Sequence, residues 1–106
     1  MEAYIYQADI ICAECAEVRR QDLKYQRILV NDSYQDSDNF PQGPYENGGG
    51  EADYPQHCGN CNLFLENPLT NDGEKELKIL LSKPASNGIA EIIHAEYKQY
   101  YDYLFQ

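Results

Sequence analysis

The sequence HCGNC at residues 57–61 places two cysteines two residues apart behind a histidine, and CAEC at residues 12–15 holds the other two cysteines of the chain. Zinc prefers four tetrahedral thiolate or imidazole ligands, and two sulfurs of a C-x-x-C turn each reach about 2.3 Å from one ion. We therefore predict that Cys12, Cys15, Cys58 and Cys61 bind one structural zinc ion. Because four thiolates complete the tetrahedron, His57 is expected to lie beside the site and not to ligate.

The separation of the two pairs leaves other interpretations open. Forty-two residues lie between Cys15 and Cys58, more than the roughly 15–20 of a usual zinc ribbon, but loop closure grows only logarithmically with length. A rubredoxin-like iron site uses the same four thiolates. A thioredoxin-like redox site would also place C-x-x-C after a strand, but it needs a βαβ pattern that the glycine-rich middle of the chain does not supply.

Size and the first residues bear on the cellular setting. A chain of 106 residues fits one domain and buries only about two-thirds of its unfolded surface, so a cross-link would help it. Residues 1–12 resemble neither a secretory signal nor a membrane span. We therefore expect a cytoplasmic protein without a membrane partner, in a compartment where paired cysteines more often hold metal than form disulfides.

Net charge narrows the class of partner. Eighteen acidic residues against eight basic ones give a formal net charge of -10, which opposes binding to a phosphate backbone. Direct nucleic-acid binding is therefore not expected, and a basic protein surface is the favoured partner. The plainer interpretation is that the acidic residues only keep the protein soluble.

Local patterns divide the chain into four regions. Residues 3–12 are rich in β-branched and aromatic residues and predict a strand. Residues 13–30 predict either a short helix or a turn followed by a strand. Residues 31–57 contain three prolines, four glycines and six acidic residues, which predicts a long, partly ordered loop.

The fourth region predicts a short strand and two helices. The first helix follows a cap at Asn71 or Asp72 and stops before Pro84. The second spans roughly residues 87–104. Its apolar stripe is predicted to be core and comprises Ile89, Ile92, Ile93, Tyr97, Tyr100, Tyr101 and Leu104. Tyr103 and Phe105 fall off this stripe, which indicates either a homodimer or partner contact or a chain end packed on its own domain.

These regions predict an α+β fold. Residues 1–106 form a single domain, with a zinc-ribbon-like sheet and loop 31–57 within residues 1–73 and a helical tail over residues 74–106. With all four cysteines in a closed site, no position remains on zinc for water or substrate. No nucleophile elbow or phosphate-binding glycine loop occurs in the sequence, so we predict a non-enzyme without catalytic residues.

Three strings carry a resemblance: YIYQADIIC, DSDNFPQGPYENGGGEADYPQHCGNC and FLENPLTNDG. They resemble segments of a group of small proteins from bacteria and their phages, in which one C-x-x-C pair follows the first strand and another ends the glycine-rich segment. The match covers roughly residues 3–73. This resemblance implies a four-cysteine zinc site and a phage origin, hence a host cytoplasm, but it implies no activity.

The acidic middle segment is the predicted site of function. We expect a zinc-stabilised interaction module that presents this segment to a protein partner. The residues predicted to bind it are Asp36, Asp38, Phe40, Tyr45, Asp53 and Tyr54. An alternative is an acidic mimic of nucleic acid that inhibits a nuclease or an anti-phage defence complex, and a further alternative is a C-x-x-C redox protein.

Overall fold

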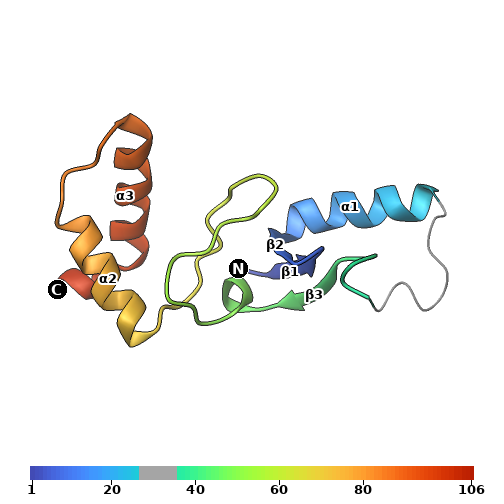
Figure 1. Cartoon of the computed structure of the whole chain (residues 1–106), viewed down its shortest axis with the longest axis horizontal. Coiled ribbons are helices and arrows are strands. Elements are labelled where there is room, and N and C mark those ends of the chain that lie inside the picture. The colour runs from blue at the N-terminus through green and yellow to red at the C-terminus, as the bar shows by residue number, and fades with distance from the viewer. Residues whose placement is uncertain (27–35) are drawn as a thin grey trace.

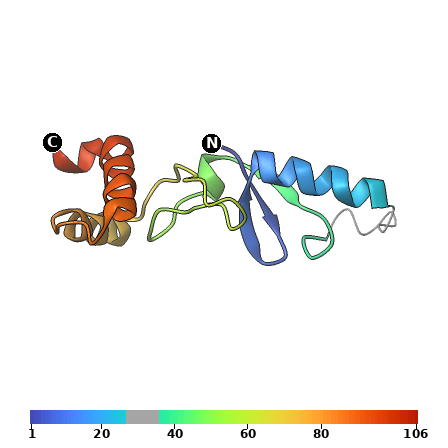
Figure 2. The same cartoon turned by 90° about the horizontal axis from the view of Figure 1, so that it is seen from above.

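The computed structural model describes residues 1–26 and 36–106. Within that part the fold is α+β, with one three-stranded antiparallel sheet of order β2-β1-β3 and three α-helices. The molecule is elongated, with extents of 50 × 28 × 17 Å and a radius of gyration of 16.3 Å, against about 13 Å for a compact chain of this length. The sheet and α1 lie at one end and α2 and α3 at the other, joined by loops (Figures 1 and 2).

The predicted single strand over residues 3–12 is instead a hairpin. Strand β1 (Ala3–Tyr6) pairs with β2 (Asp9–Cys12), with Tyr4 opposite Ile11 and Tyr6 opposite Asp9. The two-residue turn between the strands places Gln7 and Ala8 at positive φ, 51° and 60°. Hairpin turns favour this left-handed backbone because it matches the twist of the strands, although Asn or Gly usually occupies it.

Part of the predicted loop over residues 31–57 forms the third strand. β3 (Gln42–Tyr45) pairs with β1 at the edge of the sheet, and an edge strand tolerates Pro44 because one side of its backbone needs no partner. The 3₁₀ turn η2 (Asn47–Gly49) follows. Gly48 has φ 62°, and a Cβ there would lie 2.3 Å from the carbonyl oxygen of Leu65, so both conformation and space require glycine.

Helix α1 (Ala13–Gln26) resolves the choice left open for residues 13–30 in favour of a helix up to Gln26. The alternative of a turn followed by a strand is therefore wrong as far as Gln26, and residues 27–30 lie outside the described residues. Ala16 and Leu23, seven residues apart, are both buried, as expected for one face of a helix. Arg20 lies 5.4 Å from the ring centre of Tyr4 and 5.0 Å from that of Phe40.

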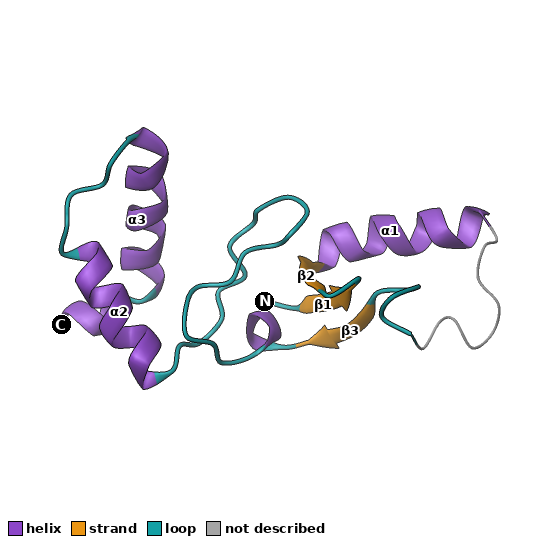
Figure 3. Cartoon of the chain, viewed as in Figure 1, coloured by secondary structure: helices purple, strands orange, loops and turns teal. Residues whose placement is uncertain are grey.

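The C-terminal region contains α2 (Asn71–Leu81) and α3 (Gly88–Tyr100), followed by the 3₁₀ turn η3 (Asp102–Phe105) (Figure 3). The N-cap of α2 is Thr70, and not Asn71 or Asp72, because the Thr70 hydroxyl accepts a hydrogen bond from the Gly73 amide at 3.0 Å. The predicted strand before α2 is reduced to isolated bridges at Phe64 and Leu69.

The prediction that Ile89, Ile92 and Tyr100 belong to the core is wrong, because these residues are 73%, 72% and 40% exposed. Only the C-terminal part of the α3 stripe, from Ile93 onward, packs against neighbours. Tyr103 and Phe105, expected to lie off the stripe, are indeed exposed. A helical stripe identifies one face, but only tertiary contacts decide how much of that face is covered.

Two hydrophobic clusters divide the interior. The N-terminal cluster comprises Ala3, Ile11, Cys12, Ala16, Cys58 and Leu65. The C-terminal cluster comprises Phe64, Leu69, Leu77, Leu81, Tyr97 and Tyr101. Phe64 and Leu65 are consecutive, and their side chains enter different clusters, as the alternation of an extended segment permits. One short segment therefore contributes to both halves of the molecule.

Candidate metal centre

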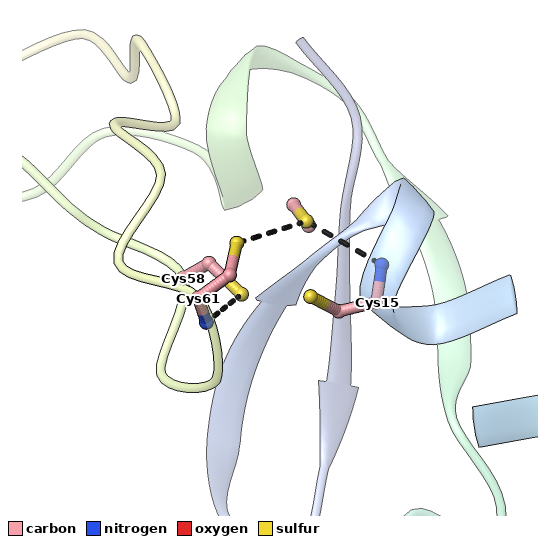
Figure 4. A group of neighbouring side chains, drawn as sticks. Cys15, Cys58 and Cys61 are labelled. Atoms are coloured by element: carbon pink, nitrogen blue, oxygen red, sulfur yellow. Dashed lines mark hydrogen bonds between the residues drawn. The ribbon is translucent and has the colours of Figure 1, made fainter. Parts of the chain in front are cut away.

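The four cysteine sulfurs converge between the hairpin, α1 and the turn at residues 58–61. Cys12 is the last residue of β2, Cys15 lies in the first turn of α1, and the other pair comes from the turn (Figure 4). All four Sγ atoms lie within 4.8 Å of one another. The prediction that the two C-x-x-C pairs meet is confirmed.

The sulfur separations fit a tetrahedral ion better than a disulfide. The Sγ atoms of Cys12 and Cys61 are 3.7 Å apart, close to the edge of about 3.8 Å for a tetrahedron with zinc–sulfur bonds of about 2.3 Å. A disulfide has an S–S distance of about 2.05 Å, and all four cysteines are free thiols. The donor set is therefore one that suits zinc or iron.

Backbone amides are aimed at two of the sulfurs. Cys58 Sγ accepts hydrogen bonds from the amides of Asn60 and Cys61, both at 3.4 Å, and Cys12 Sγ accepts one from the Cys15 amide at 3.5 Å. Such donors stabilise negative charge on sulfur. The turns thus provide the electrostatic support that metal-bound thiolates need.

The second cysteine turn is fixed against β2. The Gly59 amide donates to the carbonyl of Ile10 at 2.7 Å. A Cβ at Gly59 would meet the carboxylate of Asp9, which is the end of an exposed side chain and can move aside, so glycine lets the turn approach β2 without displacing that side chain. The contact holds the sulfurs of Cys58 and Cys61 over the end of the hairpin.

The thiols differ in acidity. Burial raises the pKa of Cys58, but the amides of Cys61, Cys12 and Asn60 outweigh it and lower that pKa to about 6. The hydrogen bond from the Asn60 side chain lowers the pKa of Cys15. Burial and the three neighbouring thiols raise it by more, so the pKa of Cys15 is raised to about 12. Burial also raises the pKa of Cys12. Four thiolates this close repel one another, and a bound cation offsets that repulsion.

His57 lies next to Cys58 in sequence but is not part of the sulfur cluster, and both of its ring nitrogens have other partners. Its Nδ1 lies 2.8 Å from the carbonyl oxygen of Asn62, and its Nε2 lies 2.6 Å from the hydroxyl of Tyr97 on α3. A carbonyl can only accept, so Nδ1–H donates to it and Nε2 accepts from the tyrosine. His57 therefore connects the cysteine turn to the C-terminal helices.

A groove of about 620 Å³ runs beside the sulfur cluster. Cys15 and Cys61 line it, together with Asp9, Glu14 and Val18 of the hairpin and α1. Cys12 and Cys58, by contrast, are each only 2% exposed. The cluster is therefore closed on one side and accessible on the other.

The six residues predicted to bind a partner are not equally placed. Asp38, Tyr45 and Tyr54 are exposed. Phe40 is buried under Arg20, so its side chain is not available to a partner. Two of the acids have structural partners: Asp36 accepts from the amide of Asp38, and Asp53 accepts from the Thr70 hydroxyl. Both side chains therefore also take part in local structure.

Asn67 is the structural residue that sequence reasoning missed. It is fully buried. Its Oδ1 accepts from the Gln56 amide at 2.7 Å, and its Nδ2 donates to the carbonyls of Tyr54 and Pro68. Its own carbonyl accepts from the Tyr101 hydroxyl. An asparagine before proline predicts only a turn, so no local sequence signal indicates that Asn67 is a buried hydrogen-bonding residue.

Comparisons with protein-family models, curated proteins and solved structures found no match to this chain. None of the described helices is long and apolar enough to cross a membrane. The site is therefore interpreted from its geometry alone.

Proposed function

We propose that this protein is a non-enzymatic, zinc-ribbon-like interaction module whose N-terminal half is held together by one structural zinc ion. The observation that carries this proposal is the convergence of four free thiols from two distant turns within 4.8 Å. Cys12 and Cys58 are also members of the N-terminal hydrophobic cluster. Metal binding and core formation would therefore be one event, as in other small zinc domains.

The partner surface we propose is a hollow of about 440 Å³ beside the hairpin. Ile5, Ile10 and Tyr54 supply its apolar lining, and Asp9 and Glu51 supply its charge. Among residues 1–26 and 36–106, those that line it include neither lysine nor arginine. An apolar hollow with acidic edges, on a protein of net charge -10, suits a basic segment of a partner protein that also carries an apolar side chain.

The metal is tested by native mass spectrometry of protein purified without added metal, before and after chelation. We expect one zinc per chain and loss of folded structure when zinc is removed. One iron per chain would change the identity of the ion but not its role. Metal-free, folded protein would contradict the proposal.

The partner surface is tested with a fluorescent peptide of alternating lysine and leucine, followed by anisotropy and by amide chemical shifts. We expect shifts around Tyr54 and weaker binding by the variants Tyr54→Ala and Glu51→Lys, with a salt dependence typical of charge attraction. Ile92→Ala, a change at another exposed residue, on the distant α3, is the matched control. Equal affinity for all variants, or no binding, would contradict the proposed surface.

The mimicry and redox alternatives stay predictions, as do the homodimer through the C-terminal helix and the phage origin. The charge of the chain fits mimicry, but the acids of residues 36–53 that are tied into local hydrogen bonds serve the fold. For this reason we favour the interaction module.

A further inference from the structure

We propose that Cys61 is a modification site at which a neutral peroxide oxidises the metal centre, with Cys12 as the thiol that completes a disulfide. This inference rests on the proposed zinc site and adds a means of regulating it. It assigns different roles to four cysteines that the sequence pattern treats as equivalent.

Access distinguishes Cys61 from two of the other thiols. Cys61 is exposed, and it lines the groove of about 620 Å³ with Cys15, whereas Cys12 and Cys58 are buried. A small reagent therefore reaches the centre from the groove side. Oxidation of cysteine follows exposure and thiolate character, so the two groove-lining thiols are the candidates.

Hydrogen bonding then separates Cys61 from Cys15. The side-chain amide of Asn60 donates to Cys15 Sγ at 3.3 Å. The backbone amides of the turns donate to Cys58 and Cys12. In the described part of the chain, no N–H group donates to Cys61 Sγ. A donor withdraws electron density from a metal-bound sulfur and lowers its reactivity, so Cys61 keeps the most nucleophilic sulfur.

The charge of the groove selects the reagent. Asp9, Glu14 and Asp22 contribute carboxylates, and Arg19, the one cation among the described residues that line the groove, lies 3.5 Å from Asp22. A net negative groove disfavours anionic oxidants and thiol reagents such as glutathione. Hydrogen peroxide and small alkyl hydroperoxides are neutral and fit this field.

The chemistry balances with peroxide as the two-electron oxidant. Cys61 Sγ attacks the peroxide, the O–O bond breaks, and with one proton the products are a Cys61 sulfenic acid and water or an alcohol. The thiolate of Cys12, 3.7 Å away, then attacks the sulfenic sulfur, the S–O bond breaks, and the hydroxide takes a second proton from solvent and leaves as water as the disulfide forms. Two of the four metal ligands are lost, and the remaining pair, Cys15 and Cys58, no longer closes the site.

The experiment uses the intact, metal-loaded protein. Limiting hydrogen peroxide is added, zinc release is followed with a chromogenic chelator, and the remaining thiols are alkylated and mapped by mass spectrometry. We expect Cys61 to react at least about tenfold faster than Cys58. We also expect a Cys12–Cys61 disulfide and one zinc released per disulfide. Comparable rates at all four thiols, a different first site, or an inert centre would each overturn the inference.

A second variant tests the role of hydrogen bonding without removing a ligand. Asn60→Ala deletes the donor to Cys15 and leaves all four sulfurs in place. We expect Cys15 to become several-fold more reactive while Cys61 is unchanged, and an unchanged Cys15 would contradict the explanation. Metal content is measured on the same samples. Absence of metal would contradict the proposed function, whereas one zinc with no preference for Cys61 would contradict only this inference.

Discussion

The two ends of this molecule are stabilised by different means. The buried N-terminal cluster contains two alanines, two cysteines and only two larger aliphatic side chains, with Tyr4, Tyr6 and Ile10 partly buried against it. The C-terminal cluster contains leucines and aromatic rings, with Phe64 lying 5.2 Å from Tyr97 and 5.5 Å from Tyr100 between ring centres. Hydrophobic stabilisation scales with buried apolar area, so the helical end has its own hydrophobic core, whereas we propose that the sheet end also needs the metal that its four sulfurs would bind.

Chelation of the metal is the largest test of this difference. Structural zinc contributes an apparent binding free energy of about 10–16 kcal/mol in small domains, as much as the whole stability of many proteins. We expect chelation, or Cys58→Ser, to abolish amide protection in β1, β2 and α1 and to leave part of the protection in α2 and α3. Hydrogen exchange measures both ends at once, and simultaneous loss at both would show a single cooperative unit.

Asn67→Ala tests the junction between the two ends. The substitution leaves the Gln56 amide and the carbonyls of Tyr54 and Pro68 without their side-chain partner. We expect the free energy of unfolding to fall by about 2–3 kcal/mol, measured by urea denaturation. Asn71→Ala changes an exposed asparagine at the start of α2 and should stay within about 0.5 kcal/mol. Similar effects for both variants would contradict the role given to Asn67.

Tyr97→Phe tests the link through His57. Burial raises the pKa of Tyr97, as does Glu96, so the hydroxyl is protonated at neutral pH and donates to His57 Nε2. We expect its removal to cost about 1 kcal/mol and to lower amide protection in the turn at residues 58–62 as well as in α3. Tyr100→Phe removes a hydroxyl bonded to the Glu66 carbonyl and should leave that turn unaffected. Equal amide protection of the turn in Tyr97→Phe and Tyr100→Phe would contradict the proposed link through His57.

Ile92→Ala is expected to have the smallest effect. The Ile92 side chain is exposed, whereas Leu81 of α2 is buried in the C-terminal cluster. We expect thermal unfolding to show a change within about 0.5 kcal/mol for Ile92→Ala and a loss of about 2–5 kcal/mol for Leu81→Ala. A large loss at Ile92 would reveal a covering surface, such as a second copy of the chain.

The sequence predicts the chemistry of the centre better than its surroundings. The spacing within each C-x-x-C pair is visible in the sequence, so the meeting of the two pairs could be predicted. The α+β class could be predicted from the local strand and helix patterns. The hairpin could not, because Gln7 and Ala8 occupy a left-handed turn without the Asn-Gly signal. The exposure of Ile89 and Ile92 could not be predicted either, because the periodicity of α3 identifies its apolar face but not how far along the helix that face is covered.

The burial of Phe40 shows a related limit. Its position in a stretch rich in proline, glycine and acids suggested an exposed aromatic, but Arg20 of α1 covers its ring. That contact joins residues twenty positions apart through a cation and an aromatic face. Such long-range pairing leaves no pattern in a single sequence, and neither does the accessibility difference between Cys61 and Cys58.

The separation of the two cysteine turns also has a consequence for biosynthesis. At a translation rate of about 5–20 residues per second, the 46 residues from position 16 to position 61 take about 2 to 9 s to synthesise. During that interval Cys12 and Cys15 have no second pair to share an ion with. If the proposed zinc site is correct, the nascent chain presents half of it during this interval, and synthesis of the acidic middle segment sets the earliest time at which all four ligands can bind the ion.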